Sequence, residues 1–319
     1  MSTNLSTPAT AGATNRSWIF YAGVLVLFWG VWGAFSSQPT QRYGYPDEMV
    51  YIIWAVVMII PAVVAKRGHR LDRRPIAAVY GLLVGLTGAG GQLLLFKALA
   101  NGPAYLIFPL VALSPAITVL LAIVALRERL KLLAVLGLLM ALVAVVFFSI
   151  SGDSGDAATG PWLLFAMIVC VAWGVQAFFM RKAATVGVND ATTFTWMTIS
   201  GLLLVPVAFA MMGGLPGSFP WQAPVLTGGT QLLNAIGALA LVMALSRGKA
   251  SIVAPVTNAL APVLTIILSL AVYQTLPSAF GAAGIVLALI GSTLMVYSDE
   301  KRGEAETVGA ADVAAPGVR

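Results

Sequence analysis

Long apolar stretches alternate with short polar ones along almost the whole chain. Ten of these stretches approach the roughly 20 residues that a helix needs to cross the hydrocarbon core of a bilayer. Short connections rich in glycine, proline and aspartate separate them, as is typical of turns. The ten predicted helices cover residues 18–37, 49–65, 76–99, 104–126, 132–150, 161–180, 192–213, 225–245, 250–273 and 278–297. The pattern therefore predicts an all-α integral membrane protein.

Composition excludes a soluble globular protein. Of the 319 residues, 59% are hydrophobic and 9% are charged, whereas soluble domains carry roughly 25% charged residues. The two ends of the chain, 1–17 and 298–319, hold too few apolar residues to form a core, and we expect both to be disordered cytoplasmic tails. The single cysteine, Cys170, cannot form an internal disulfide and is interpreted as a packing residue.

The positive charges gather on one side of the membrane if the first helix begins in the cytoplasm. The cytoplasmic segments then hold sixteen of the eighteen lysines and arginines, and only Arg42 and Lys97 lie on the other side. This distribution follows the positive-inside rule and predicts an inner (plasma) membrane protein with both termini cytoplasmic. The net charge of +6 is thus interpreted as a topology signal, and no nucleic-acid partner is expected.

A long motif occurs twice, at residues 98–130 and again about 146 residues later at 244–276. Around it, the alignment extends to a first five-helix unit (18–150), a linker loop (151–160) and a second five-helix unit (161–297). Because five is odd, the second unit starts on the opposite side of the membrane and forms an inverted repeat. Two similar units of opposite orientation can exchange an inward-open shape for an outward-open one, which is alternating access.

The prolines of the two copies differ in spacing. Pro109 and Pro115 match Pro255 and Pro262, which lie one residue further apart. We therefore expect a bulge or a break in the ninth predicted helix. An offset of 146 also matches the glycines of the third helix to polar residues of the eighth. It is preferred to a rival offset near 140 because it runs without gaps into the repeated motif.

The repeated unit resembles the EamA repeat of the drug/metabolite transporter (DMT) superfamily. The matching residues are A-L-x-x-G-x-A at 98–104 and 244–250, P-L-x-x-L-x-P at 109–115 and L-x-E-x-L at 126–130. The resemblance implies a transporter whose central cavity is lined mainly by helices one, three, four, six, eight and nine, with the other four outside. Gln274 departs from the pattern, since the family usually has there the glutamate that Glu128 provides in the first copy.

Polar uncharged residues are the candidates for a substrate site, because the middle of the predicted helices has almost no ionisable residue. Residues of this kind share helix faces, and tryptophans lie near mid-membrane in matching positions. Plain helix packing is the alternative for each of them. The candidate substrate-binding residues are Trp29, Trp32, Gln92, Ser114, Thr118, Trp173, Gln176, Gln231, Asn234 and Asn258. Indoles and amides suit an uncharged or zwitterionic organic solute.

Two charged residues are candidates for a gate or an anion contact. Lys97 lies near the outer end of the third helix, where it could extend to the headgroups or capture a substrate carboxylate. Glu128 lies between Arg127 and Arg129, in a cluster that we interpret as a topology anchor or a gate contact.

These patterns favour a secondary transporter that moves a small organic metabolite by alternating access. The alternatives are a flippase for a lipid or lipid carrier, or a membrane enzyme, which the missing Ser-His-Asp and metal-ligand patterns disfavour. We expect no cofactor and no metal, contact with the lipid bilayer, and a monomer or weak dimer. The substrate and the direction of transport stay open. The missing midplane carboxylate predicts that transport is not strictly coupled to protons.

Overall fold

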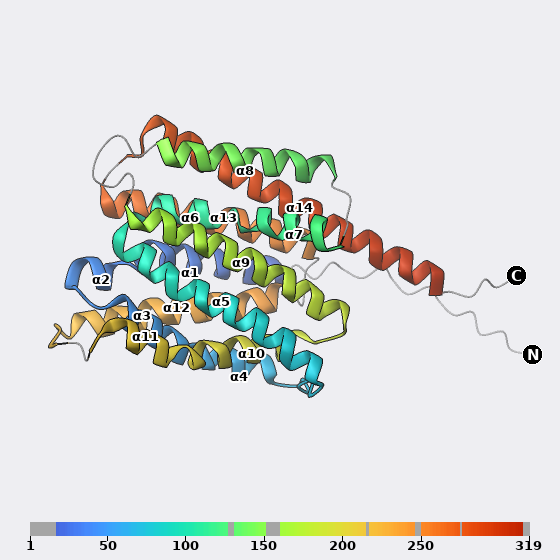
Figure 1. Cartoon of the computed structure of the whole chain (residues 1–319), viewed down its shortest axis with the longest axis horizontal. Helices are drawn as coiled ribbons and strands as arrows, with labels where there is room; N and C mark the ends of the chain where they lie inside the picture. The colour runs from blue at the N-terminus through green and yellow to red at the C-terminus, as the bar shows by residue number, and fades with distance from the viewer. Residues whose placement is uncertain are drawn as a thin grey trace, which may run out of the picture.

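The computed structural model describes residues 17–126, 131–150, 160–214, 217–245, 250–274 and 276–314. Within these ranges every regular element is an α-helix, and the long helices lie side by side in one bundle (Figure 1). Helix α1 begins and α14 ends at the same end of the bundle, on the right in Figure 1, whereas α2 lies at the opposite end.

Fourteen helices follow one another in the described ranges, and several are paired across a short break. In chain order they are α1 (Ser17–Phe35), α2 (Gln38–Tyr43), α3 (Asp47–Val57), α4 (Ile59–Lys66), α5 (Pro75–Asn101), α6 (Ala104–Val111), α7 (Ser114–Leu126), α8 (Leu132–Ile150), α9 (Pro161–Thr185), α10 (Asp190–Leu203), α11 (Val205–Met212), α12 (Gln222–Leu245), α13 (Ala250–Tyr273) and α14 (Ala279–Ala314).

Nine stretches of the described residues are long and apolar enough to cross a membrane. They are Ser17–Tyr43, Asp47–Lys66, Pro75–Asn101, Ala104–Leu121, Pro161–Thr185, Asp190–Met212, Gln222–Leu241, Val256–Tyr273 and Ala279–Ser298, and a shorter apolar helix covers Leu132–Phe148. Large apolar side chains such as Phe20 (68% exposed), Leu142 (57%) and Leu164 (62%) point away from the core. A surface this apolar is suited to lipid rather than to water.

Prolines explain where the broken helices end. Pro61 and Pro206 lack the N–H that would continue the helix from α3 into α4 and from α10 into α11. Pro115 stands in the first turn of α7, directly after the break that ends α6. The expected break in the ninth predicted helix is wrong, because α13 runs uninterrupted from Ala250 to Tyr273. The irregular copy of the motif is therefore the first one.

The last helix is longer than its apolar part. Residues after Ser298 were expected to form a disordered tail, but α14 continues to Ala314 and comprises 36 residues. At 1.5 Å per residue this length is about 54 Å, well beyond the roughly 30 Å of hydrocarbon in a bilayer.

Helix packing joins the two halves of the chain. Helix α8 packs along α14, α5 packs along α9, and α1 packs against both α12 and α13. A Cβ atom added to Gly137 would lie 2.6 Å from the carbonyl oxygen of Gly291, so α8 and α14 touch through their backbones. The core between these pairs contains the candidate site.

Candidate functional site

Three tryptophans and two amides form a hydrogen-bonded cluster inside the bundle. We call Trp29, Trp32, Trp54, Gln231 and Asn234 the indole–amide cluster. The indole of Trp32 donates to Gln231 Oε1 (3.2 Å), and that of Trp54 donates to Asn234 Oδ1 (3.0 Å). The indole of Trp29 donates to the backbone oxygen of Asn234 (3.1 Å). These bonds join α1 and α3 to α12 and satisfy polar groups that would otherwise be costly in an apolar interior.

Trp54 is not among the site residues that the sequence pattern predicts. The family resemblance places the second predicted helix outside the cavity, but Trp54 on α3 is only 9% exposed and bonds to α12. Tyr51, on the same helix, is fully buried and donates to the backbone oxygen of Gly201 (2.9 Å). A signal was present, because Trp54 lies well inside the span Asp47–Lys66, as Trp29 and Trp32 lie inside theirs.

The second half repeats part of this geometry. Trp173 on α9 donates to the backbone oxygen of Gly88 on α5 (3.2 Å), as Trp29 does to Asn234. The two donors are 144 residues apart in sequence and the two acceptors 146. A second matched pair follows, since Thr118 donates to Gly174 (2.9 Å) and Thr265 to Gly30 (3.2 Å). These contacts support the offset near 146.

Glycines allow the indoles of both halves to approach the backbone. A Cβ atom on Gly91 would lie 2.5 Å from Trp173 Nε1, and one on Gly237 would meet the ring of Trp29. A Cβ atom on Gly88 would likewise meet the amide of Gln176. The glycine face of α5 is therefore a surface for close helix packing, the alternative that the sequence left open.

Two amides, one on α5 and one on α9, have spare hydrogen-bonding capacity. Gln92 is only 6% exposed, and its Nε2 atom has no hydrogen-bond partner among the described residues. Gln176 Nε2 has one weak contact, to the sulfur of Met197 at 3.9 Å. A buried amide donor without a partner costs roughly 1–3 kcal/mol. Such groups in native structures call for a partner such as water or a ligand.

The other predicted site residues lie elsewhere. Ser114 and Thr118 lie where α7 meets α9. Thr118 donates to the backbone oxygen of Gly174, and a Cβ atom on Gly174 would lie 2.6 Å from the backbone oxygen of Ser114. Asn258 on α13 is exposed, and Glu128 lies outside the described residues. The structure thus brings five of the predicted residues into indole hydrogen bonds: Trp29, Trp32, Trp173, Gln231 and Asn234. A sixth, Gln176, lies against Gly88 of α5.

Lys97 is engaged by carboxylates of its own chain. Its Nζ atom lies 2.6 Å from Glu48 Oε1 and 3.4 Å from Asp47 Oδ2, with only 26% of the lysine side chain exposed. Both acids stand in the first turn of α3, where the helix dipole favours negative charge. Capture of a substrate carboxylate by Lys97 would first require this pairing to break.

One end of the bundle is crossed by hydrogen bonds around Tyr273. Its hydroxyl donates to Gln41 Oε1 (2.7 Å) and lies 3.1 Å from Ser37 Oγ. The amide nitrogen of Gln41 in turn donates to the backbone oxygens of Leu99 (2.8 Å) and Gly102 (3.3 Å). These bonds connect the end of α13 to α2, to the last turn of α5 and to the residue that follows it. We call this set the tyrosine seal.

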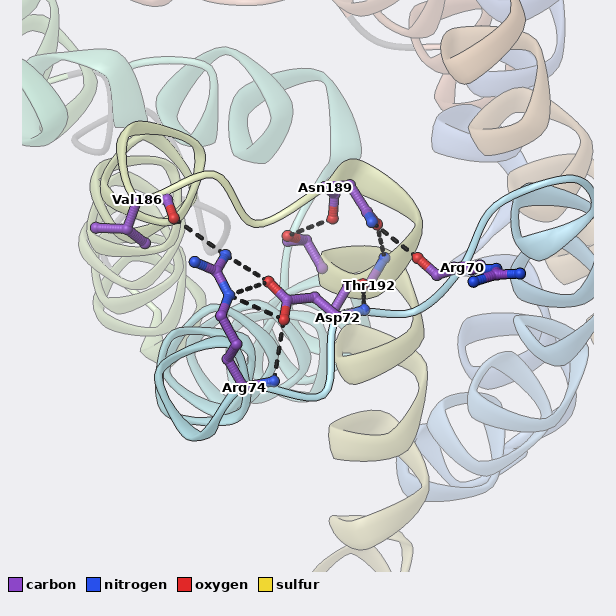
Figure 2. Close-up of polar contacts among 7 residues, drawn as sticks. Arg70, Asp72, Arg74, Val186, Asn189 and Thr192 are labelled. Atoms are coloured by element: carbon purple, nitrogen blue, oxygen red, sulfur yellow. Dashed lines mark hydrogen bonds and ion pairs between the residues drawn. The ribbon is translucent and has the colours of Figure 1, made fainter.

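The opposite end carries a polar clasp between the α4–α5 loop and the α9–α10 turn (Figure 2). The backbone nitrogen of Asp72 donates to Thr192 Oγ1 (2.8 Å), and Asn189 Nδ2 donates to the backbone oxygen of Arg70 (3.0 Å). Arg74 donates both to Asp72 and to the backbone oxygen of Val186. Its hydrogen bonds hold the pKa of the Asp72 carboxyl below its usual range. We call this set the loop clasp.

Asn189 allows the contribution of helix capping to be measured separately from that of the loop clasp. Its Oδ1 atom caps α10 by accepting from the Thr192 nitrogen (2.8 Å), while its Nδ2 atom holds Arg70. Asn189→Ala should lower stability by about 1 kcal/mol more than Asn189→Ser, since serine retains the cap. Unfolding in detergent would measure the difference. Equal losses for the two variants would show that the cap contributes nothing.

Comparison with known proteins places both halves in one family. The profile of the EamA-like transporter family matches residues 16–150 and 160–297. An uncharacterized protein of Methanocaldococcus jannaschii is 28% identical over 130 residues, which are 40% of this chain and 94% of that protein. A solved crystal structure aligns with a TM-score of 0.58 and 22% identity, over 91% of this chain and 99% of the other.

In the described part of the chain, no group of three or more His, Cys, Asp or Glu side chains could hold a metal ion.

Proposed function

Because the chain belongs to the EamA-like transporter family, we propose that it is a secondary transporter that moves a small organic metabolite across the inner membrane by alternating access. Membership makes it a multi-pass membrane protein and favours a carrier over an enzyme. In this proposal ten helices form two inverted five-helix units, 18–150 and 161–297, and both termini are cytoplasmic. The common end of α1 and α14 supports placing both termini on one side of the membrane (Figure 1), and the positive-inside rule favours the cytoplasmic side.

Contacts between the two halves at both ends of the bundle support the mechanism. At the outer end the tyrosine seal joins Tyr273 of the second half to Gln41 of the first. At the cytoplasmic end the loop clasp joins Asp72 to Thr192 and Arg70 to Asn189. Alternating access requires one set to separate while the other holds, because a pathway open at both ends would be a channel.

The substrate would bind beside the indole–amide cluster. The observation that carries this proposal is the buried Gln92 Nε2 atom, which has no partner among the described residues. Gln176 offers a second amide, and Trp173 an aromatic face. Amides and indoles suit an uncharged or zwitterionic solute. None of these groups is a carboxylate, which supports transport without strict proton coupling.

The Gln92→Leu variant distinguishes a role of Gln92 in substrate binding from a role in helix packing. Replacing an unsatisfied buried amide by an apolar group of similar size should leave stability unchanged or higher. Transport should nevertheless fall about tenfold or more, the factor that corresponds to 1.4 kcal/mol. Flux of a metabolite panel into proteoliposomes, together with thermal unfolding in detergent, would measure both quantities.

Two further variants serve as controls for this experiment. Gln231→Leu should lower transport and stability together, because it leaves the Trp32 indole without its acceptor. Thr293→Val changes a polar residue of α14 that, among the described residues, bonds to its own helix alone (2.7 Å to Leu289) and should change neither quantity. Normal flux in Gln92→Leu would remove Gln92 from the site. No flux of any solute by the unmodified protein would contradict the transporter itself.

A further inference from the structure

A hollow of about 380 Å³ lies at the outer end of the bundle, between α2 and the beginning of α12. Its volume falls in the range of small-molecule pockets, roughly 300–1,000 Å³. The wall contains three aromatic rings, two amides and a single charge: Phe35, Tyr43, Trp221, Gln38, Gln222 and Arg42. It is separate from the indole–amide cluster, and no part of the proposed function uses it.

The charge in this wall is not neutralised. Arg42 lies on the last turn of α2, and its Cζ atom is 5.6 Å from the centre of the Tyr43 ring. No carboxylate of the described residues pairs with it, since the ion pairs found there involve Lys97 and Arg74. An arginine is always charged and offers five donors in a planar fork. The hollow therefore presents unused anion-binding capacity.

The proposed membrane topology also sets Arg42 apart from most other cations of the chain. In the proposed orientation, on which this step rests, Arg42 and Lys97 are the two cations on the outer side, against the positive-inside rule. Two carboxylates form ion pairs with Lys97, so the charge of Lys97 stabilises the fold. Arg42 contacts the Tyr43 ring and the end of α2, but no carboxylate of the described residues pairs with it.

The apolar residues of the hollow indicate that a ligand also has an apolar part. Trp221 is 70% exposed and Val225 is 61% exposed at the rim of the hollow. Exposed aromatic surface beside an unpaired guanidinium suits a molecule that joins an apolar body to an anionic group. The amides of Gln38 and Gln222 can donate further hydrogen bonds to that group.

We propose that this hollow is an outer docking site for a small organic carboxylate with an aromatic or aliphatic body. Arg42 binds the carboxylate, the amides complete its hydrogen bonds, and Phe35 and Trp221 contact the body. This deepens the proposed function by naming the class of solute that the transporter meets on its outer face. A zwitterionic substrate satisfies both sites, since it brings a carboxylate to Arg42 and carries no net charge to the indole–amide cluster.

Binding of 3-phenylpropionate to the purified full chain tests this docking site. Calorimetry in nanodiscs of neutral phosphatidylcholine should detect binding, and added salt should weaken it. Arg42→Gln should raise the dissociation constant about tenfold, because a charge-assisted contact is lost. Val225→Trp, which fills the hollow and leaves the charge in place, should also weaken binding.

Matched controls make the result decisive. Arg67→Gln removes an exposed arginine at the other end of the bundle and should leave binding unchanged. The neutral 3-phenylpropionamide should bind about tenfold more weakly than the acid. Equal binding of acid and amide, or unchanged binding in Arg42→Gln, would overturn the proposal. Displacement of the probe in nanodiscs with phosphatidylglycerol would overturn it too, by assigning the hollow to a lipid headgroup. Because binding is measured without flux, its failure is distinguishable from failure of the transporter.

Discussion

Replacing Lys97 by methionine should lower the free energy of unfolding by about 1–3 kcal/mol, less than the roughly 3–5 kcal/mol of a fully buried ion pair, because 26% of the lysine side chain is exposed. Methionine is the residue that matches Lys97 in the second half, at position 243, so the change is compatible with a span of this family. It leaves the Glu48 side chain, only 7% exposed, without the ammonium 2.6 Å away. Unfolding of the purified protein in detergent would measure the loss.

The partners of Lys97 supply the controls. Adding Glu48→Gln to Lys97→Met should recover most of the lost stability, since the stranded charge is then absent. Asp47→Asn should recover less, because Asp47 lies further from the ammonium, at 3.4 Å. If Lys97→Met unfolds like the unmodified protein, the pair does not hold α5 to α3.

Adding one methyl group at Gly91 should be similarly damaging, at about 1–3 kcal/mol. The new Cβ atom would lie 2.5 Å from the Trp173 indole nitrogen. The ring would have to move, and the bond to the Gly88 oxygen would be lost with it. Thermal unfolding should show a lower midpoint, and transport should fall because the contact joins the two halves.

The neighbouring glycine provides a matched control on the same helix. A Cβ atom on Gly90 meets nothing within 4 Å, so Gly90→Ala should keep or raise stability through its better helix propensity. Combining Gly91→Ala with Trp173→Leu should cost less than the sum of the two changes, because the smaller side chain frees the space. Equal effects at the two glycines would mean that the indole does not press on α5.

Much of the helical framework could be predicted from local pattern. Apolar length located the spans. Offsets of 144 and 146 match Trp29 with Trp173 and Asn234 with Gly88, and both indoles donate to the matching backbone oxygens. These features could be found because each depends on residues near one another in sequence or on a duplication that preserves spacing. Proline was less informative, since Pro115 marks a break while α13 continues through its own prolines.

Side-chain partners could not be predicted in the same way. The sequence left Lys97 either to extend to the headgroups or to capture a carboxylate, but its partners lie some 50 residues away on α3. Trp54 lies 180 residues from the amide it contacts. Pairings of this kind depend on how helices are arranged in space, which periodicity along a single helix does not contain. The unpartnered Gln92 Nε2 atom is likewise visible only after every neighbouring bond is placed.

The packing of α1 against the second half also sets the order in which the protein can mature. The indole of Trp29 and its acceptor are 205 residues apart. At about 5–20 residues per second of synthesis, α1 waits on the order of 10 to 40 s for α12. During that interval its glycine-flanked tryptophans face lipid or an assisting protein. Errors in biogenesis should therefore concentrate on this first helix, which is made early and waits for partners in the second half.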